Sequence, residues 1–181
     1  MERWMRVPLW SGLATVVAGS VMGGVMMMAP SGAASARAGT PRASTAECTK
    51  ANLTATYKGG DAATSHVFGR IVLRNTSDET CFVKGYGGLS YVGGGNGTQI
   101  GAPADRTPSA TPRTVLQPGD KVRSAVVETS TGPYSPKECR PTKVDGFRVY
   151  VPDETRSIFI AHPTTGCAND AIHLLTHKAY H

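Results

Sequence analysis

The chain contains four cysteines, and none of them belongs to a Cys-x-x-Cys pair. Zinc sites built from cysteine need such closely spaced pairs, so the spacing argues against a metal site. An even number of widely spaced cysteines in an exported chain is typical of a disulfide framework. We therefore expect two disulfides, and the residues alone leave open which of three pairings they adopt. The cysteines are Cys48, Cys81, Cys139 and Cys167.

The amino-terminal segment has the order of a secretory signal peptide. A short start with net positive charge precedes residues 7–29, none of which is charged. Pro30 then breaks any helix, and the small residues around Ala36 suit a signal peptidase. We expect residues 1–36 to be a signal peptide that is cleaved after Ala36.

An uncleaved membrane anchor is the alternative interpretation of the same segment. The uncharged run is long enough for it, because about 20 residues suffice to cross a bilayer. Glycines and serines dilute the apolar character of the run, and a cleavage site follows at once, which favours the signal peptide. We expect a protein that is secreted, or associated with the cell wall, outside the reducing cytoplasm.

The remainder of the chain has the pattern of a single all-β domain. Residues 37–47 have nothing to bury and are expected to form a disordered leader. From residue 48 to 181, short runs of alternating apolar and polar residues are separated by glycine and proline, which is strand and turn chemistry. We expect a β-sandwich, or a small barrel, of eight or nine strands. The expected strands cover residues 53–57, 66–74, 81–83, 89–92, 114–116, 121–128, 147–151, 157–161 and 171–176.

The motifs of this domain, taken in order, resemble one family. An Asn-x-Ser turn at Asn75 precedes the second cysteine, and a Gly-Tyr-rich segment follows at 85–89. A Leu-x-Pro-Gly-Asp turn at 116–120 comes before the third cysteine, and a Val-x-Val-Pro strand at 149–152 lies between the third and the fourth. This succession spans nearly all of the mature chain and resembles the exported actinobacterial domain of unknown function 4232.

The resemblance implies an immunoglobulin-like sandwich, export and sequential disulfides, Cys48–Cys81 and Cys139–Cys167. One departure is Gly87, which stands where the family often has proline and is expected to leave the turn freer. The family has no assigned activity, and a sandwich fold hosts many functions, so the fold alone does not supply one.

Three histidines recur at intervals of four residues near the carboxyl end: His173, His177 and His181. On one strand this spacing places all three side chains on one face, where neutral imidazoles could hold zinc, copper or nickel. No carboxylate side chain or cysteine lies between these histidines in the sequence. We expect a polar face of an edge strand, with no metal site.

No motif in the chain indicates catalysis or a cofactor. There is no Gly-x-Ser-x-Gly elbow, and the glycine run at 93–97 lacks the Gly-Lys-Ser/Thr ending of a phosphate loop. Glu138 and the Asp153-Glu154 pair could act as acid and base, but solvated loop charges are the simpler interpretation. We expect no enzyme activity, no cofactor, and a hairpin loop at the glycine run.

The formal net charge of +6 is spread along the chain without a run of four basic residues. That distribution argues against dedicated nucleic-acid binding, but it permits weak attraction to anionic polymers of the cell wall. We expect a monomeric, non-enzymatic binding or structural module of the envelope, whose partner is a wall polymer or another envelope protein. The alternative is a small extracellular hydrolase, or a metal-binding protein that uses the three histidines.

Loops on a rigid scaffold carry function more often than the scaffold itself. The candidate loops are residues 93–112 and 130–136, and the candidate ligand contacts there are Tyr91 and Tyr134. The alternative for either tyrosine is that it packs at the end of a strand.

Overall fold

The computed structural model describes residues 44–181, so the expected signal peptide and residues 37–43 of the expected leader lie outside the described residues. The regular elements of the described residues are strands, apart from one short helix, α1 (Pro136–Cys139). The all-β fold class is confirmed. No helix in this part of the chain is long and apolar enough to cross a membrane.

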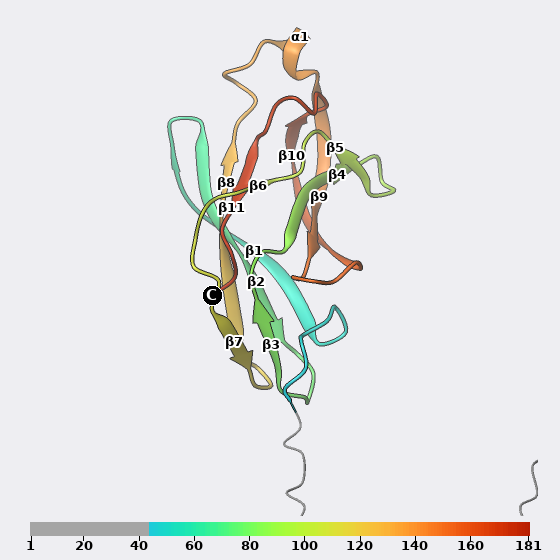
Figure 1. Cartoon of the computed structure of the whole chain (residues 1–181). Coiled ribbons are helices and arrows are strands. Elements are labelled where there is room, and N and C mark those ends of the chain that lie inside the picture. The colour runs from blue at the N-terminus through green and yellow to red at the C-terminus, as the bar shows by residue number, and fades with distance from the viewer. Residues whose placement is uncertain (1–43) are drawn as a thin grey trace, which may run out of the picture. The chain divides into compact units, whose positions relative to one another are not determined.

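Two sheets hold most of the strands in residues 44–181, and Figure 1 shows one beside the other. The strands of the first sheet are, in order, β1 (Leu53–Ala63), β2 (His66–Asn75), β8 (Lys121–Thr129), β11 (Leu175–His177) and β6 (Asp105–Arg106). Those of the second are β10 (Ser157–Cys167), β9 (Pro141–Tyr150), β4 (Gly88–Gly93) and β5 (Thr98–Ile100). A separate ribbon pairs β3 (Cys81–Lys84) with β7 (Arg113–Leu116).

The strand order is that of an immunoglobulin-like sandwich. Such sandwiches place strands A, B, E and D in one sheet and G, F and C, with C′ added, in the other. Here β1, β2 and β8 occupy the A, B and E positions, and β10, β9, β4 and β5 occupy the G, F, C and C′ positions. β6 corresponds to D, but β11 lies between β6 and β8, parallel to the former and antiparallel to the latter. The carboxy-terminal segment therefore widens the first sheet by an inserted strand.

The core lies between the two sheets and follows the period of two in the strand sequences. Along β8, every second residue from Val122 to Glu128 is buried, and the residues between them are exposed or half-buried. Side chains from both sheets form one apolar cluster, in which Phe147 of β9 is the largest fully buried member. The burial of one large apolar side chain stabilises the fold by roughly 1.5–3 kcal/mol. The alternation of apolar and polar residues therefore determines which face of each strand points inward.

Two disulfides are formed, in the sequential pairing that the family resemblance implies. Cys48 is bonded to Cys81, which joins the segment before β1 to the first residue of β3. Cys139 is bonded to Cys167, which joins the last residue of α1 to the last residue of β10. All four cysteines are buried. Disulfides of this kind form in oxidising compartments, which fits a protein that functions outside the cytoplasm.

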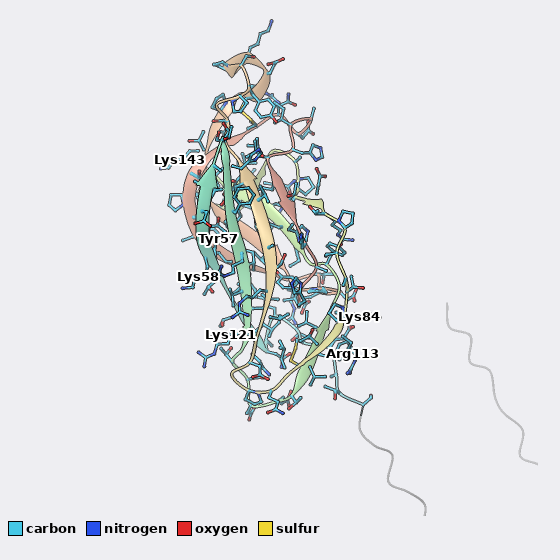
Figure 2. The ribbon with its side chains drawn as sticks, turned by 90° about the vertical axis from the view of Figure 1, so that its left-hand side faces the viewer. Tyr57, Lys58, Lys84, Arg113, Lys121 and Lys143 are labelled. Carbon is cyan, nitrogen blue, oxygen red and sulfur yellow. A yellow bond between two sulfur atoms is a disulfide. The ribbon has the colours of Figure 1, made fainter. Side chains whose placement is uncertain are left out.

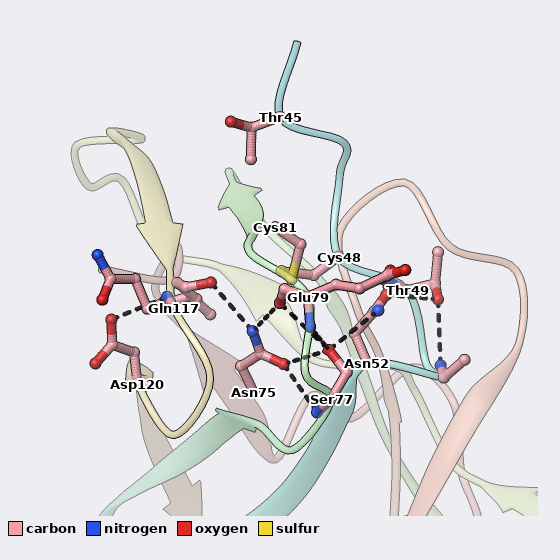
Figure 3. Close-up of a disulfide and its surroundings, with 12 residues drawn as sticks. Thr45, Cys48, Thr49, Asn52, Asn75, Ser77, Glu79, Cys81, Gln117 and Asp120 are labelled. Atoms are coloured by element: carbon pink, nitrogen blue, oxygen red, sulfur yellow. Dashed lines mark hydrogen bonds between the residues drawn. A yellow bond between two sulfur atoms is a disulfide. The ribbon is translucent and has the colours of Figure 1, made fainter. Parts of the chain in front are cut away.

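Beside the first disulfide, Asn75 connects two of the turns that carry the family motifs (Figure 3). Its side chain is fully buried and donates hydrogen bonds to the carbonyl oxygens of Glu79 and Leu116, at 2.7 and 3.1 Å. The backbone carbonyl oxygen of Asn75 accepts a hydrogen bond from the backbone amide of Gly119, and its backbone amide donates one to the carbonyl oxygen of Asp120. The Asn-x-Ser turn and the Leu-x-Pro-Gly-Asp turn are therefore one structural unit, which explains why the two motifs occur together.

Most expected strands are present, and the differences have local causes. β9 and β10 are longer than expected, because their pairing continues through a bulge between Ala161 and Thr164. The short strands β5 and β6 were missed, since two or three residues carry no readable alternation. β11 covers only part of the expected strand at 171–176. The helix α1 begins at a capping box formed by Ser135 and Glu138, a signal that the sequence does contain.

Two details refine the sequence analysis. The end of the expected leader is part of the structure: Glu47 forms a parallel bridge with Phe82, whose amide donates to the carbonyl oxygen of Ala46. Gly87 also has a structural role that its place in a turn did not indicate. A Cβ atom at this position would overlap the carbonyl oxygen of Tyr150, so glycine here allows a close approach of two backbones.

We predict that each disulfide contributes substantially to the free energy of unfolding. The sequence separations of 33 and 28 residues correspond to about 3–4 kcal/mol for each bond in the chain-entropy model. The double variants Cys48→Ala/Cys81→Ala and Cys139→Ala/Cys167→Ala should each lose about that amount in urea denaturation. A loss well below 1 kcal/mol for either pair would show that the bond is dispensable for the fold.

Candidate functional site

The alternation that buries one side of β1, β2 and β8 directs a set of basic side chains to the other side. The register aligns their outward residues in three rows across the strands. The rows are Thr54–Arg74–Lys121, Thr56–Val72–Arg123 and Lys58–Arg70–Ala125. We call the five cations of these rows the basic face: Lys58, Arg70, Arg74, Lys121 and Arg123. All five are exposed.

Like charges lie directly opposite one another on the basic face. Lys58 is paired in register with Arg70, and Arg74 is paired with Lys121. Such pairs destabilise a sheet, by up to about 1 kcal/mol each, unless an anion lies between them. Among residues 44–181 the ion pairs involve the carboxylates of Glu154, Glu128 and Asp105, and none of them includes a cation of the basic face. The charge of this face is therefore not neutralised within the described part of the chain.

The basic face is hollowed and lined by these same side chains. A hollow of about 390 Å³ is bordered by the five cations together with Thr54, Thr56 and Val72. Val72 points outward, yet it is only 9% exposed, because the aliphatic stems of long basic side chains can cover an apolar neighbour. Figure 2 faces this sheet and shows Lys58 and Lys121 on its strands. The arrangement offers guanidinium and ammonium donors around one depression, which is the chemistry of an anion site.

On the inner side of the same sheet, a buried carboxylate connects the two sheets. Glu128 of β8 accepts hydrogen bonds from the hydroxyl groups of Tyr57 of β1 and Tyr91 of β4, the latter at 2.6 Å. Nε2 of His162, in β10, lies 3.0 Å from the same carboxylate. Burial, together with the carboxylate, raises the pKa of both phenols well above its ordinary value. The tyrosines therefore keep their protons and remain donors to Glu128.

Aromatic rings enclose this carboxylate. Phe147 stacks on His162 at a centroid distance of 4.7 Å and on Tyr91 at 5.4 Å, and Tyr57 lies edge-on to His162 at 4.8 Å. Glu128 is only 6% exposed, so a substrate has little access to it, and the cluster acts as a polar connection between the sheets. Sequence reasoning missed Glu128, although its position in phase with the buried residues of β8 was a usable signal.

The three carboxy-terminal histidines do not share one strand face. β11 covers only Leu175–His177, so His173 and His181 do not belong to the strand that contains His177. His173 contacts Asp105 at 2.9 Å, while His177 is buried and packs edge-on against Tyr86. His181 pairs with β8 through its backbone. No three histidine, cysteine, aspartate or glutamate side chains gather within the described residues closely enough to hold a metal ion.

The two tyrosines named as ligand contacts differ in their exposure. Tyr91 is a core residue of β4 and is only 4% exposed, so it cannot contact a ligand on the loop surface. Tyr134 lies in the expected loop but is half-buried and packs against the core. The glycine run at 93–97 is the turn of a hairpin that connects β4 to β5, as expected.

The carboxylates considered as acid and base have structural contacts. Glu138 accepts from the hydroxyl of Ser135 at 2.7 Å in the cap of α1. Glu154 is paired with Arg156 at 3.1 Å, and the hydrogen bonds from this arginine lower the pKa of the carboxyl group to about 2. Asp153 stands in a left-handed backbone conformation before it. Asp153 and Glu154 therefore lie in a loop, as expected, whereas Glu138 belongs to the helix α1.

We predict that Tyr91→Phe destabilises the fold by roughly 1–3 kcal/mol, because it removes one donor from a buried carboxylate. Tyr150→Phe is the matched control, since no hydrogen bond is formed by that hydroxyl group in the described residues. Urea denaturation of both variants measures the difference. Equal losses would contradict a supporting role for the Glu128 cluster.

We also predict a pH dependence of stability that involves His177. Burial, and to a smaller degree Arg106, lowers the pKa of this imidazole in the folded protein. The unfolded chain, with an ordinary histidine pKa of about 6.5, then binds the proton more readily. The contribution of the neutral imidazole to the free energy of unfolding is complete above the unfolded pKa. It is lost as the pH falls from the unfolded pKa to the lower pKa of the folded protein. Between pH 7.5 and 5.5, His177→Gln should lose less unfolding free energy than the wild type, and an equal loss would contradict the assignment.

Comparison with protein families gives one match. Residues 48–178 match the family model described as Domain of unknown function (DUF4232). No curated protein matches the chain significantly, and neither does any solved structure. The matched region contains all four cysteines, the basic face and the Glu128 cluster. Since it covers well over half of the sequence, the chain belongs to the DUF4232 family.

Proposed function

We propose that this protein is a secreted, non-enzymatic module of the cell envelope that binds an anionic phosphodiester polymer through the basic face. The observation that carries the proposal is the grouping of five cations around one hollow, with like charges directly opposite and without a carboxylate partner in the described residues. An external polyanion would neutralise these charges and remove their mutual repulsion.

The chemistry of the basic face favours phosphate groups. Three of its cations are arginines, and their planar guanidinium groups form paired hydrogen bonds with phosphate oxygens. Thr54 and Thr56 add hydroxyl donors at the border of the hollow. Alternate residues along a strand repeat at about 7 Å, and neighbouring strands lie about 5 Å apart, so a ligand with several regularly spaced charges can meet several cations at once.

A polymer with a sugar or polyol backbone suits this hollow better than a nucleic acid. Proteins that bind single-stranded nucleic acids combine a basic groove with aromatic side chains on which the bases stack. The hollow is lined by cations, threonines and one valine, without an aromatic ring among them. A single-stranded DNA of equal charge therefore serves as the competing ligand in the test below.

The compartment supports the same proposal. The disulfides fit an oxidising environment, and the expected signal peptide would deliver the domain to the surface where charged wall polymers are found. A non-enzymatic role is supported by the structural contacts of Glu138 and Glu154 and by the enclosure of Glu128.

The test is a binding measurement with poly(glycerol phosphate) as the probe and the oxidised protein. The triple variant Lys58→Gln/Arg74→Gln/Arg123→Gln should weaken binding by roughly tenfold or more, which corresponds to about 1.4 kcal/mol. The control Lys50→Gln/Lys137→Gln/Lys143→Gln loses the same charge from exposed positions outside the hollow and should change the affinity by less than about threefold.

The possible results separate the alternatives. Weaker binding of the first variant alone supports the basic face as the site. An equal effect of both variants would reduce the interaction to net charge, and no binding at low salt would contradict the proposal. A clear preference for single-stranded DNA over the phosphodiester probe would also overturn it, in favour of nucleic-acid recognition.

A further inference from the structure

The outer face of the second sheet has a different chemistry from the basic face. Phe159 of β10 is 58% exposed, an uncommon position for a phenylalanine. In register it lies opposite Arg148 of β9, whose guanidinium group reaches across to Oε1 of Gln99 at 2.6 Å. An aromatic ring and planar polar side chains therefore occupy neighbouring positions on this face.

The phenylalanine ring rests on the sheet because its neighbour has no side chain. A Cβ atom built at Gly146 would lie 2.9 Å from Cε2 of Phe159, so any other residue at this position would push the ring away. The same Cβ would overlap the carbonyl oxygen of Ile160, which makes glycine doubly necessary here. Supported from below and exposed above, the ring of Phe159 forms a flat apolar platform.

A hollow of about 480 Å³ adjoins this platform, and its lining combines apolar and polar groups. The lining residues are Val92, Gly95, Gly97, Asp145 and Phe159. Its volume lies within the range of about 300–1,000 Å³ that is typical of small-ligand sites. Phe159 supplies the apolar surface, since Val92 is only 2% exposed, and the carboxylate of Asp145 supplies hydrogen-bond acceptors.

Asp145 and the glycine hairpin are arranged so that a polar ligand can reach them. Oδ2 of Asp145 accepts from the amide of Gly95 at 2.8 Å, which fixes the carboxylate, while Oδ1 has no donor among the described residues. Gly94, Gly95 and Gly97 all have positive φ and present no side chains, so a ligand can approach their backbone closely.

We propose that this hollow binds a sugar ring of a neutral glycan. A pyranose has an apolar face of C–H groups, which packs on an aromatic ring, and a rim of hydroxyl groups, which donate to a carboxylate. Phe159 and Asp145 offer these two surfaces on the border of one hollow. A purely apolar partner would leave Oδ1 of Asp145 without a donor, so the combination favours a sugar. The site shares no residue with the basic face and stands independently of the function proposed for it.

The experiment is a titration of the oxidised protein with tetrameric oligosaccharides of N-acetylglucosamine and of glucose. Calorimetry measures the affinity, and amide NMR shifts locate the site. At least one of the two should bind, with shifts centred on β9, β10 and the 93–97 hairpin. Phe159→Ala and Asp145→Asn should each weaken binding by roughly tenfold or more. Phe68→Ala is the matched control, because Phe68 is 47% exposed but lies on β2 of the other sheet, and it should leave the affinity unchanged.

The unfolding midpoint of each variant shows whether it retains the fold. If Phe159→Ala is unstable, Asp145→Asn serves as the second test, because it preserves the shape of the side chain. Failure of both oligosaccharides to bind would overturn the proposal, and so would an equal loss with Phe68→Ala. Sedimentation between about 10 and 500 µM distinguishes the main alternative occupant, since a dimer that Phe159→Ala dissociates would assign this face to a second copy of the chain.

Discussion

The carboxylate of Glu128 is the interaction on which the arrangement of the domain depends. It takes hydrogen bonds from Tyr57 and Tyr91 and contacts His162, so one side chain of β8 connects β1 in its own sheet with β4 and β10 in the other. A slip of one residue in any of these strands would turn its partner away and leave the charge buried without donors. The cluster therefore fixes the register of both sheets, in addition to the disulfides at their ends.

That register determines what the domain presents to its surroundings. When Tyr57 points inward, Lys58 must point outward, and when Glu128 points inward, Arg123 must point outward. The outer face of one sheet becomes basic, while the outer face of the other carries Phe159, which borders one hollow together with the glycine hairpin. The two proposed sites thus follow from one inner arrangement, and we propose different ligands for them, a charged polymer and a neutral glycan.

The sequence was sufficient for the features that are local or that recur in a family pattern. The presence of two disulfides, the strands β1, β2 and β8, and the hairpin at 93–97 follow from spacing, alternation and turn residues. The pairing of the cysteines was implied only by the family resemblance. The functional surfaces were not predictable in the same way, because they need cross-strand register: Arg74 and Lys121 are far apart in the chain but adjacent in the sheet. Tyr91 was misjudged for a related reason, since its place near a glycine loop suggested exposure while its hydroxyl group has a buried partner.

The location of polyanion binding tests the central claim most directly. Amide shifts of the isotope-labelled, oxidised protein, followed during titration with poly(glycerol phosphate), report which strands the ligand touches. We expect the largest changes in β1, β2 and β8, at the outward residues of the three rows that contain the basic face, and small changes along β9 and β10. Changes centred on the second sheet, or spread evenly over all exposed lysines and arginines, would contradict a dedicated site on the first sheet.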